Sequence, residues 1–200
     1  MLMNRWRTAV LSALLVTLVG CENLSSKQTS AQPLPEQLEN LQRWEIRGKL
    51  GVKTSQDSAS TSVKWQQQAA DQYQINLVGP LGQGNVEIIG EPKLVSVSIK
   101  GETYTSSSAR ALLSEQLGWD LPVEQFQYWV KGVPSPNRAI DAVSYSAEGS
   151  IDSLSQDGWL IIYDKYEDFE HWRLPSKLTA SFNSLKLTLI IRDWSFNTAG

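Results

Sequence analysis

The chain has 200 residues, with 18 basic and 21 acidic side chains, one histidine and one cysteine. One cysteine cannot form an internal disulfide, and one histidine without further thiols cannot complete a zinc site. The acidic balance, with no basic run after the first ten residues, argues against a nucleic-acid partner.

The first twenty residues have the features of an export signal. Arg5 and Arg7 precede the apolar run 9–19, and no acidic residue occurs before position 21. A basic start followed by an apolar stretch of this length predicts a secretory signal, which is too short to remain as a membrane-spanning helix. We therefore expect residues 1–20 to be removed as a signal peptide.

The signal ends in Leu-Val-Gly-Cys, which resembles the bacterial lipobox. The resemblance implies diacylglycerol on the thiol of Cys21, cleavage before this residue and a third acyl chain on the freed amine. The alternative is an ordinary signal peptide with a chance cysteine. Bacterial lipoproteins of this kind are retained at the inner membrane mainly by Asp at the next position, so Glu22 points to the outer membrane. We expect a lipid-anchored protein on the periplasmic face of that membrane.

After the cysteine, residues 22–34 are mostly Ser, Gln, Thr and Pro with few apolar side chains. This composition cannot bury enough surface to offset the entropy of ordering, so the lipidated cysteine and a flexible tether are predicted at 21–34. Residues 35–200 are enough for one domain with a packed core. A short helix is expected to begin at Pro35, with Leu38, Leu41 and Trp44 on one face.

From Trp44 onward, apolar residues alternate with polar ones, as in antiparallel strands with one apolar face. Two helices are expected in the middle of the chain, at 109–117 after serines that can cap it and at 123–130. The last strand is predicted to place Leu185, Leu187, Leu189 and Ile191 on one face and Trp194 on the other. Strands are predicted at 44–53, 61–65, 73–77, 86–88, 95–99, 143–145, 151–154, 159–163, 177–182 and 185–194.

These elements predict an α+β fold, mainly β, in a single domain. About ten or eleven antiparallel strands in one domain favour a strongly curved sheet or unclosed barrel. Its concave face must be covered by apolar groups, and the two inserted helices are the candidates for a lid or plug.

No pattern in the chain indicates an active site. A catalytic triad around His171 would need a nucleophile beside it, and no Gly-x-Ser-x-Gly elbow occurs. The glycine-rich segment 79–84 lacks the Lys-Ser/Thr pair of a phosphate loop. Asp164 and Glu167 are expected on a solvated hairpin. We expect no metal, no cofactor and no enzymatic activity.

The chain has eight tryptophans, and this large side chain usually lines a space or packs at a rim. Core filling accounts for some of them. The sharper hypothesis is that Trp65, Trp129 and Trp159 form the wall of an apolar cavity under the helices. Residues of the predicted strands complete the candidate lining, namely Ile75, Leu77, Leu187 and Leu189.

Several short strings, in order along residues 36–196, resemble the outer-membrane lipoprotein receptor (LolB) family. No single string is specific, but their order together with the lipobox is. The strings are Arg47-Gly48, Trp65-Gln66-Gln67, Gly79-Pro80-Leu81-Gly82, Gly118-Trp119, Leu121-Pro122, Trp129, Gly132, Pro134, Gly158-Trp159, Tyr163, Tyr166, Leu174-Pro175 and Trp194.

The resemblance implies an unclosed antiparallel barrel whose cavity takes the acyl chains of lipoproteins. A periplasmic carrier protein of similar fold hands these lipoproteins over, and the receptor, as a monomer, releases them into outer-membrane lipid. The resemblance also implies that the loop of Gly79, Pro80, Leu81 and Gly82 contacts the membrane. The alternative for Leu81 is packing on the barrel rim. The rival functions are a structural envelope lipoprotein without a ligand and a lipid-acting enzyme.

Overall fold

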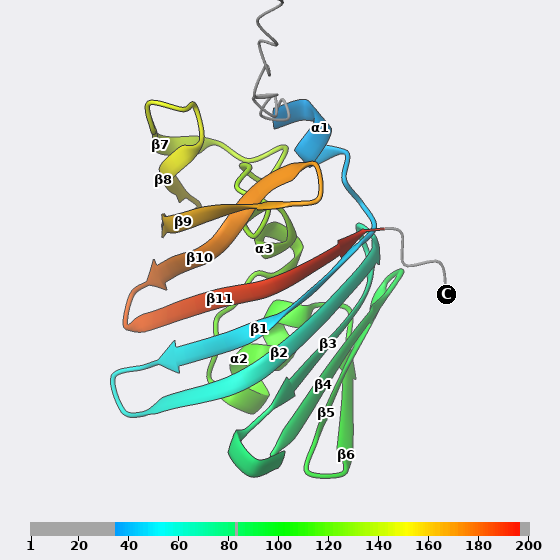
Figure 1. The fold of residues 1–200 in the computed structure, drawn as a ribbon. Helices are drawn as coiled ribbons and strands as arrows, with labels where there is room; N and C mark the ends of the chain where they lie inside the picture. The colour runs from blue at the N-terminus through cyan, green and yellow to red at the C-terminus, as the bar shows by residue number, and fades with distance from the viewer. Residues whose placement is uncertain (1–34, 83, 197–200) are drawn as a thin grey trace, which may run out of the picture. The chain divides into compact units, whose positions relative to one another are not determined.

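The computed structural model describes residues 35–82 and 84–196 (Figure 1). The predicted signal peptide, Cys21 and the tether lie outside the described residues. Within the described part, no helix combines the length and apolar character needed to cross a membrane.

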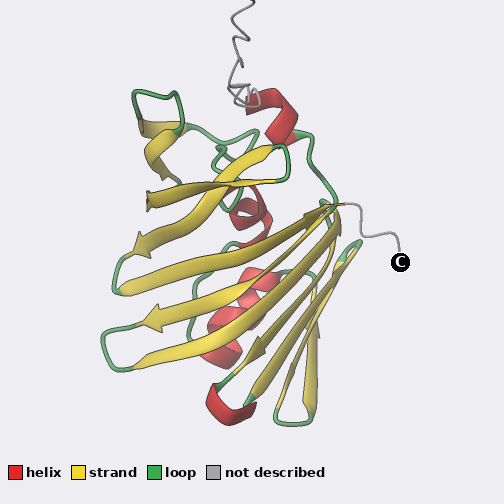
Figure 2. Ribbon diagram, viewed as in Figure 1, coloured by secondary structure: helices red, strands yellow, loops and turns green. Residues whose placement is uncertain are grey.

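One antiparallel sheet of eleven strands makes up most of the domain (Figures 1 and 2), which confirms the predicted fold class. The strand order is β6-β5-β4-β3-β2-β1-β11-β10-β9-β8-β7, so β6 and β7 are the two edges and the sheet stays open. The strands are β1 (Trp44–Lys53), β2 (Ser58–Ala69), β3 (Gln72–Val78), β4 (Asn85–Glu91), β5 (Leu94–Ile99), β6 (Glu102–Ser106), β7 (Ile140–Tyr145), β8 (Ile151–Gln156), β9 (Trp159–Phe169), β10 (Trp172–Phe182) and β11 (Leu185–Phe196).

Two helices, α2 (Ala109–Leu117) and α3 (Val123–Trp129), connect one sheet edge to the other and lie on the concave face (Figure 1). The Ser108 side chain accepts the N–H of Ala111 at 3.2 Å and caps α2. Gly118, with φ 70°, ends this helix in the left-handed conformation that glycine tolerates. These caps confirm the predicted helix at 109–117.

The first helix, α1 (Pro35–Glu39), is shorter than predicted. Leu41 lies beyond it and Trp44 begins β1, so the three residues expected on one helix face belong to different elements. All three still join the core. A helix this short has little stability of its own, because forming the first turn is costly, and β-sheet pairing at Trp44 prevails.

The prediction for Trp194 is wrong, because β11 contains a bulge. Arg47 pairs with Asp193 whereas Gly48 pairs with Ile191, so Arg192 is an extra residue. An extra residue reverses the alternation of side chains beyond it. Trp194 is therefore buried on the same face as Ile191, and its ring lies 5.4 Å from that of Trp44.

Candidate functional site

An apolar cavity lies between the concave face of the sheet and the helical segment 113–126. Its lining consists of hydrophobic side chains from both layers. The sheet contributes Leu50, Val63, Trp65, Ile75, Leu77, Ile88, Leu187 and Leu189, and the helical segment contributes Leu113, Trp119, Leu121 and Phe126.

Strand register explains why these sheet residues lie together. Trp65 is paired with Ile75, which is in turn paired with Ile88 on β4. Leu50 of β1 is paired with Leu189 of the neighbouring strand β11. Directly paired residues in antiparallel strands point to one face, so every second residue of five adjacent strands builds a continuous apolar floor.

The cavity is small in this structure. Its volume is about 40 Å³, which holds only a few water molecules. The aromatic rings of Trp119 and Phe126 belong to the covering segment rather than to the sheet. A larger ligand therefore needs this segment to move away from the floor.

The structure places five of the seven predicted cavity residues at the cavity: Trp65, Ile75, Leu77, Leu187 and Leu189. Trp129 and Trp159 do not line it. Both are almost fully buried in an aromatic cluster next to the cavity, with their rings 5.9 Å apart. Phe126, which lines the cavity, has its ring 5.8 Å from that of Trp129 and 6.4 Å from that of Trp159. The indole of Trp129 donates to Gln156 Oε1 at 2.8 Å, and Phe182 stacks on Trp159 at 5.4 Å.

Sequence reasoning missed seven lining residues. Leu50, Val63 and Ile88 carry a signal that could have found them, because each lies on the apolar face of an alternating strand. Val63 even shares its strand and face with Trp65, which was predicted. No such signal exists for the residues of the covering segment, which we call the lid. Helix periodicity does not say which residues of a lid contact a cavity. The lid residues are Leu113, Trp119, Leu121 and Phe126.

A buried amide network joins β2 to α3 beside the cavity. Trp65 Nε1 donates to Gln67 Oε1 at 2.8 Å, and Gln67 Nε2 donates to Gln127 Oε1 at 3.2 Å. Gln127 Nε2 in turn donates to the carbonyls of Ala70 and Glu124. Because buried amides are costly when unpaired, this network fixes the Trp65 ring and the position of α3.

An ion pair holds the turn that carries Trp119 and Leu121. The Arg110 guanidinium donates through Nε and Nη2 to the two carboxylate oxygens of Asp120. The hydrogen bond from Arg110 lowers the pKa of Asp120. The pair is half-exposed, so it stabilises the closed segment only modestly.

The turn between β3 and β4 contains a short 3₁₀ segment, η1 (Pro80–Gly82). Leu81 at its tip has 98% of its surface exposed and a left-handed backbone with φ 58°. This conformation costs a non-glycine residue about 1–2 kcal/mol. Leu81 does not pack on the rim of the sheet, and neither turn geometry nor core packing explains a leucine there.

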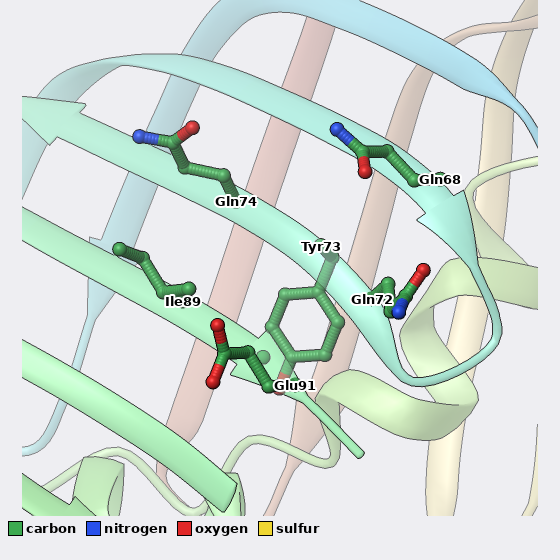
Figure 3. A pocket seen from close by; sticks show the side chains of 7 residues that line it. Gln68, Gln72, Tyr73, Gln74, Ile89 and Glu91 are labelled. Atoms are coloured by element: carbon green, nitrogen blue, oxygen red, sulfur yellow. The ribbon is translucent and has the colours of Figure 1, made fainter.

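The convex side of the sheet carries a polar hollow near the turn between β2 and β3. Figure 3 shows the amides of Gln68, Gln72 and Gln74 around Tyr73, with Glu91 beside it. Its volume is about 220 Å³, but its amide and carboxylate groups do not suit an acyl chain.

His171 lies in the turn between β9 and β10, with its ring 4.8 Å from that of Trp172. The His171 ring also lies 6.4 Å from that of Phe196. Across residues 35–82 and 84–196, no three His, Cys, Asp or Glu side chains are arranged to hold a metal ion.

Comparison with solved structures finds proteins of similar fold. A putative outer membrane lipoprotein-sorting protein domain from Vibrio parahaemolyticus aligns with a TM-score of 0.55 at 7% identity, covering 83% of this chain and 90% of that one. A LolA superfamily protein from Nitrosomonas europaea aligns with a TM-score of 0.53 at 5% identity, covering 80% and 89%. At these identities the similarity shows a shared fold.

Sequence comparison gives the family. An outer-membrane lipoprotein LolB from Cellvibrio japonicus is 41% identical over 94% of this chain and 97% of its own length. The protein of that name from Pseudomonas aeruginosa is 36% identical over 95% and 96%. The family model for outer membrane lipoprotein LolB matches residues 42–194. The chain therefore belongs to the outer membrane lipoprotein LolB family.

Proposed function

We propose that this protein is an outer-membrane-anchored receptor that accepts lipoproteins from a periplasmic carrier and inserts them into the outer membrane. The observation that carries the proposal is the cavity lined by twelve apolar side chains between sheet and lid. An acyl chain is the ligand whose chemistry matches such a lining, since each buried methylene contributes about 0.8 kcal/mol. Acyl chains on Cys21 would supply the anchor.

The lid has to open for the ligand to enter. Leu113, Trp119, Leu121 and Phe126 lie on one continuous segment, so a displacement of that segment exposes the apolar floor. The entering acyl chain then replaces the contacts that the lid loses. Transfer from the carrier proceeds without an energy source if the receptor binds acyl chains more tightly, since about 1.4 kcal/mol shifts the equilibrium tenfold.

The Leu81 turn is proposed to meet the outer membrane. An exposed leucine in a strained turn gains nothing in water, whereas burial in lipid contributes about 2 kcal/mol. That energy is too small for an anchor but sufficient to orient a domain that is already tethered. No bond chemistry and no cofactor are part of this function.

Binding of a fluorescent fatty acid to the full-length protein tests the cavity. We expect saturable binding, and Leu121→Glu should weaken it more than tenfold, because the new carboxylate faces the apolar lining. Leu160→Glu is the matched control, since Leu160 is an exposed leucine of β9 outside the cavity. Absence of binding by the wild type would favour a structural lipoprotein without a ligand.

A further inference from the structure

Two lysines face each other on the convex side of the sheet. Lys53 ends β1 and is directly paired with Lys186 at the start of β11. Like charges in directly opposed positions destabilise a sheet. Within residues 35–82 and 84–196, no carboxylate forms an ion pair with either ammonium. No carboxylate in the described part of the chain therefore compensates this repulsion.

The two lysines border a hollow of about 270 Å³. Gly51 leaves its floor open, because a Cβ at this position would meet nothing nearer than the Thr188 carbonyl oxygen at 3.8 Å. Ser58 and Thr188 add hydroxyl groups to the lining. The acid nearest in sequence, Asp57, accepts the backbone N–H of Ser58 at 2.7 Å. Two ammonium and two hydroxyl groups around an open floor suit a phosphate group.

The hollow lies at the same end of the sheet as Leu81. Because β2 runs antiparallel between β1 and β3, these two strands end on the same side, toward the lower left of Figure 1. Lys53 is the last residue of β1, and the Leu81 turn follows β3. η1 also contacts β2, the strand that contributes Ser58.

We propose that Lys53 and Lys186 bind the phosphate of an anionic membrane lipid when the Leu81 end of the domain meets the bilayer. This inference rests on the proposed function, which directs the Leu81 end of the domain toward the outer membrane. Leu81 then contacts the apolar part of the bilayer, and the two lysines contact the lipid headgroup. Phosphate bound between the ammonium groups removes the repulsion that the pair carries in water.

The test uses the full-length protein anchored in phosphatidylcholine vesicles, with and without phosphatidylglycerol. A fluorescent unnatural amino acid at position 55, in the turn after β1, reports contact through quenching by a headgroup-labelled lipid. We expect phosphatidylglycerol to strengthen quenching and Lys53→Gln with Lys186→Gln to remove this preference. Each lysine contributes about a fivefold factor near an anionic surface, so the expected loss is roughly 30-fold in the contact equilibrium.

Two controls separate a built pocket from general surface charge. Lys93→Gln with Lys165→Gln removes the same charge nearer the other end of the strands and should leave the preference intact. Gly51→Val keeps both charges but fills the floor, and it should reduce the preference severalfold. If the two double variants behave alike, or Gly51→Val has no effect, the pocket is not a phosphate site.

A second arm distinguishes lipid from free phosphate. If inorganic phosphate at constant ionic strength stabilises the wild type but not the lysine variant, while phosphatidylglycerol changes nothing, the lipid assignment is wrong. Leu81→Glu should lower quenching in both kinds of vesicle. If Leu81→Glu lowers quenching but the lysine variants leave it unchanged, the phosphate pocket is wrong and the proposed membrane orientation stands. If Leu81→Glu has no effect on quenching, the proposed membrane orientation is wrong.

Discussion

Gly48 and Gly51 lie three residues apart in β1 but differ in the space available for a side chain. A Cβ on Gly48 would lie 2.0 Å from the carbonyl oxygen of Ile190, beside the bulge of β11. Backbone atoms at this distance have to move, and the bulge is what positions Trp194 against Trp44. The close approach explains why the residue after Arg47 is glycine.

Gly48→Ala should therefore destabilise the protein by about 2–4 kcal/mol through backbone strain and a disturbed bulge. Gly51→Ala is the matched control, because its Cβ meets only ordinary contacts and alanine loses less entropy on folding. Urea unfolding monitored by tryptophan fluorescence measures both. Equal stability of the two variants would contradict the close approach at Gly48.

The tryptophans also differ in what they can report. Trp65 and Trp119 line the cavity, whereas Trp129 and Trp159 are buried behind Phe126 and do not line it. An acyl ligand should shift the emission of the first pair by excluding water and leave the second pair nearly unchanged. Trp65→Phe with Trp119→Phe is expected to remove most of the ligand-induced change in fluorescence. Trp129→Phe with Trp159→Phe should retain it, and the reverse result would place the ligand against Trp129 and Trp159 instead.

At the scale of elements, Lys131 joins α1 to the end of α3. It is 2% exposed, and its Nζ donates to the carbonyls of Glu39 at 3.2 Å and Leu41 at 3.0 Å. Burial lowers the pKa of Lys131 to about 8. The charged ammonium is thus held beside two backbone carbonyls and over the Tyr128 ring, at 4.9 Å. No carboxylate of the described residues forms an ion pair with it, and the charge of Glu39 offsets the effect of burial only in part.

This arrangement makes stability depend on pH. Between pH 8 and the ordinary lysine pKa of 10.5, the native state has lost the Lys131 proton while the unfolded state keeps it. The free energy of unfolding should therefore rise with pH in this window, by up to about 1.4 kcal/mol per unit, and stay flat below it. The difference between wild type and Lys131→Met, from urea unfolding at several pH values, isolates this contribution. A flat difference from pH 7 to 10 would show that Lys131 is solvated.

The strands were predictable wherever one face is apolar, as in β1 and β11, because alternation is then visible. β6 was not predicted, since Glu102–Ser106 is a polar edge strand with no buried side chain. β10 begins before the predicted residue 177, at Trp172, with Pro175 inside it. Pro175 fits because β10 is paired with β11 only from Lys177 onward, so that stretch is free on one side.

The candidate site was predictable from the sequence on the sheet side only. Residues such as Ile75 and Leu187 lie on the apolar face of a strand, and any curved sheet directs that face inward. Which lid residues meet them depends on how α2 and α3 dock, and contacts far apart in sequence decide that. Gln67 with Gln127, and Trp129 with Gln156, are such contacts, and no local periodicity encodes them.

At the scale of the whole molecule, the two ends of the sheet are expected to differ in function. The end with Leu81 and the lysine pair carries groups suited to a bilayer, whereas the other end carries the amide hollow of Figure 3. Two exposed leucines make this difference testable. Leu81 follows β3 at one end, and Leu94, 45% exposed, begins β5 at the other.

Leu81→Glu should leave unfolding and acceptance of lipoprotein from the carrier unchanged, because the side chain is 98% exposed and is not part of the cavity lining. Release into membranes should slow markedly, because burial of the leucine is replaced by a carboxylate that lipid excludes. Leu94→Glu makes the same chemical change at the opposite end and should leave every step intact. Delivery of a labelled lipoprotein from the loaded receptor to liposomes measures the difference. Equal delivery rates for the two variants, or a lower melting temperature for Leu81→Glu, would show that Leu81 has no role in release into the membrane. The exposed leucine in its left-handed backbone conformation would then have no functional explanation.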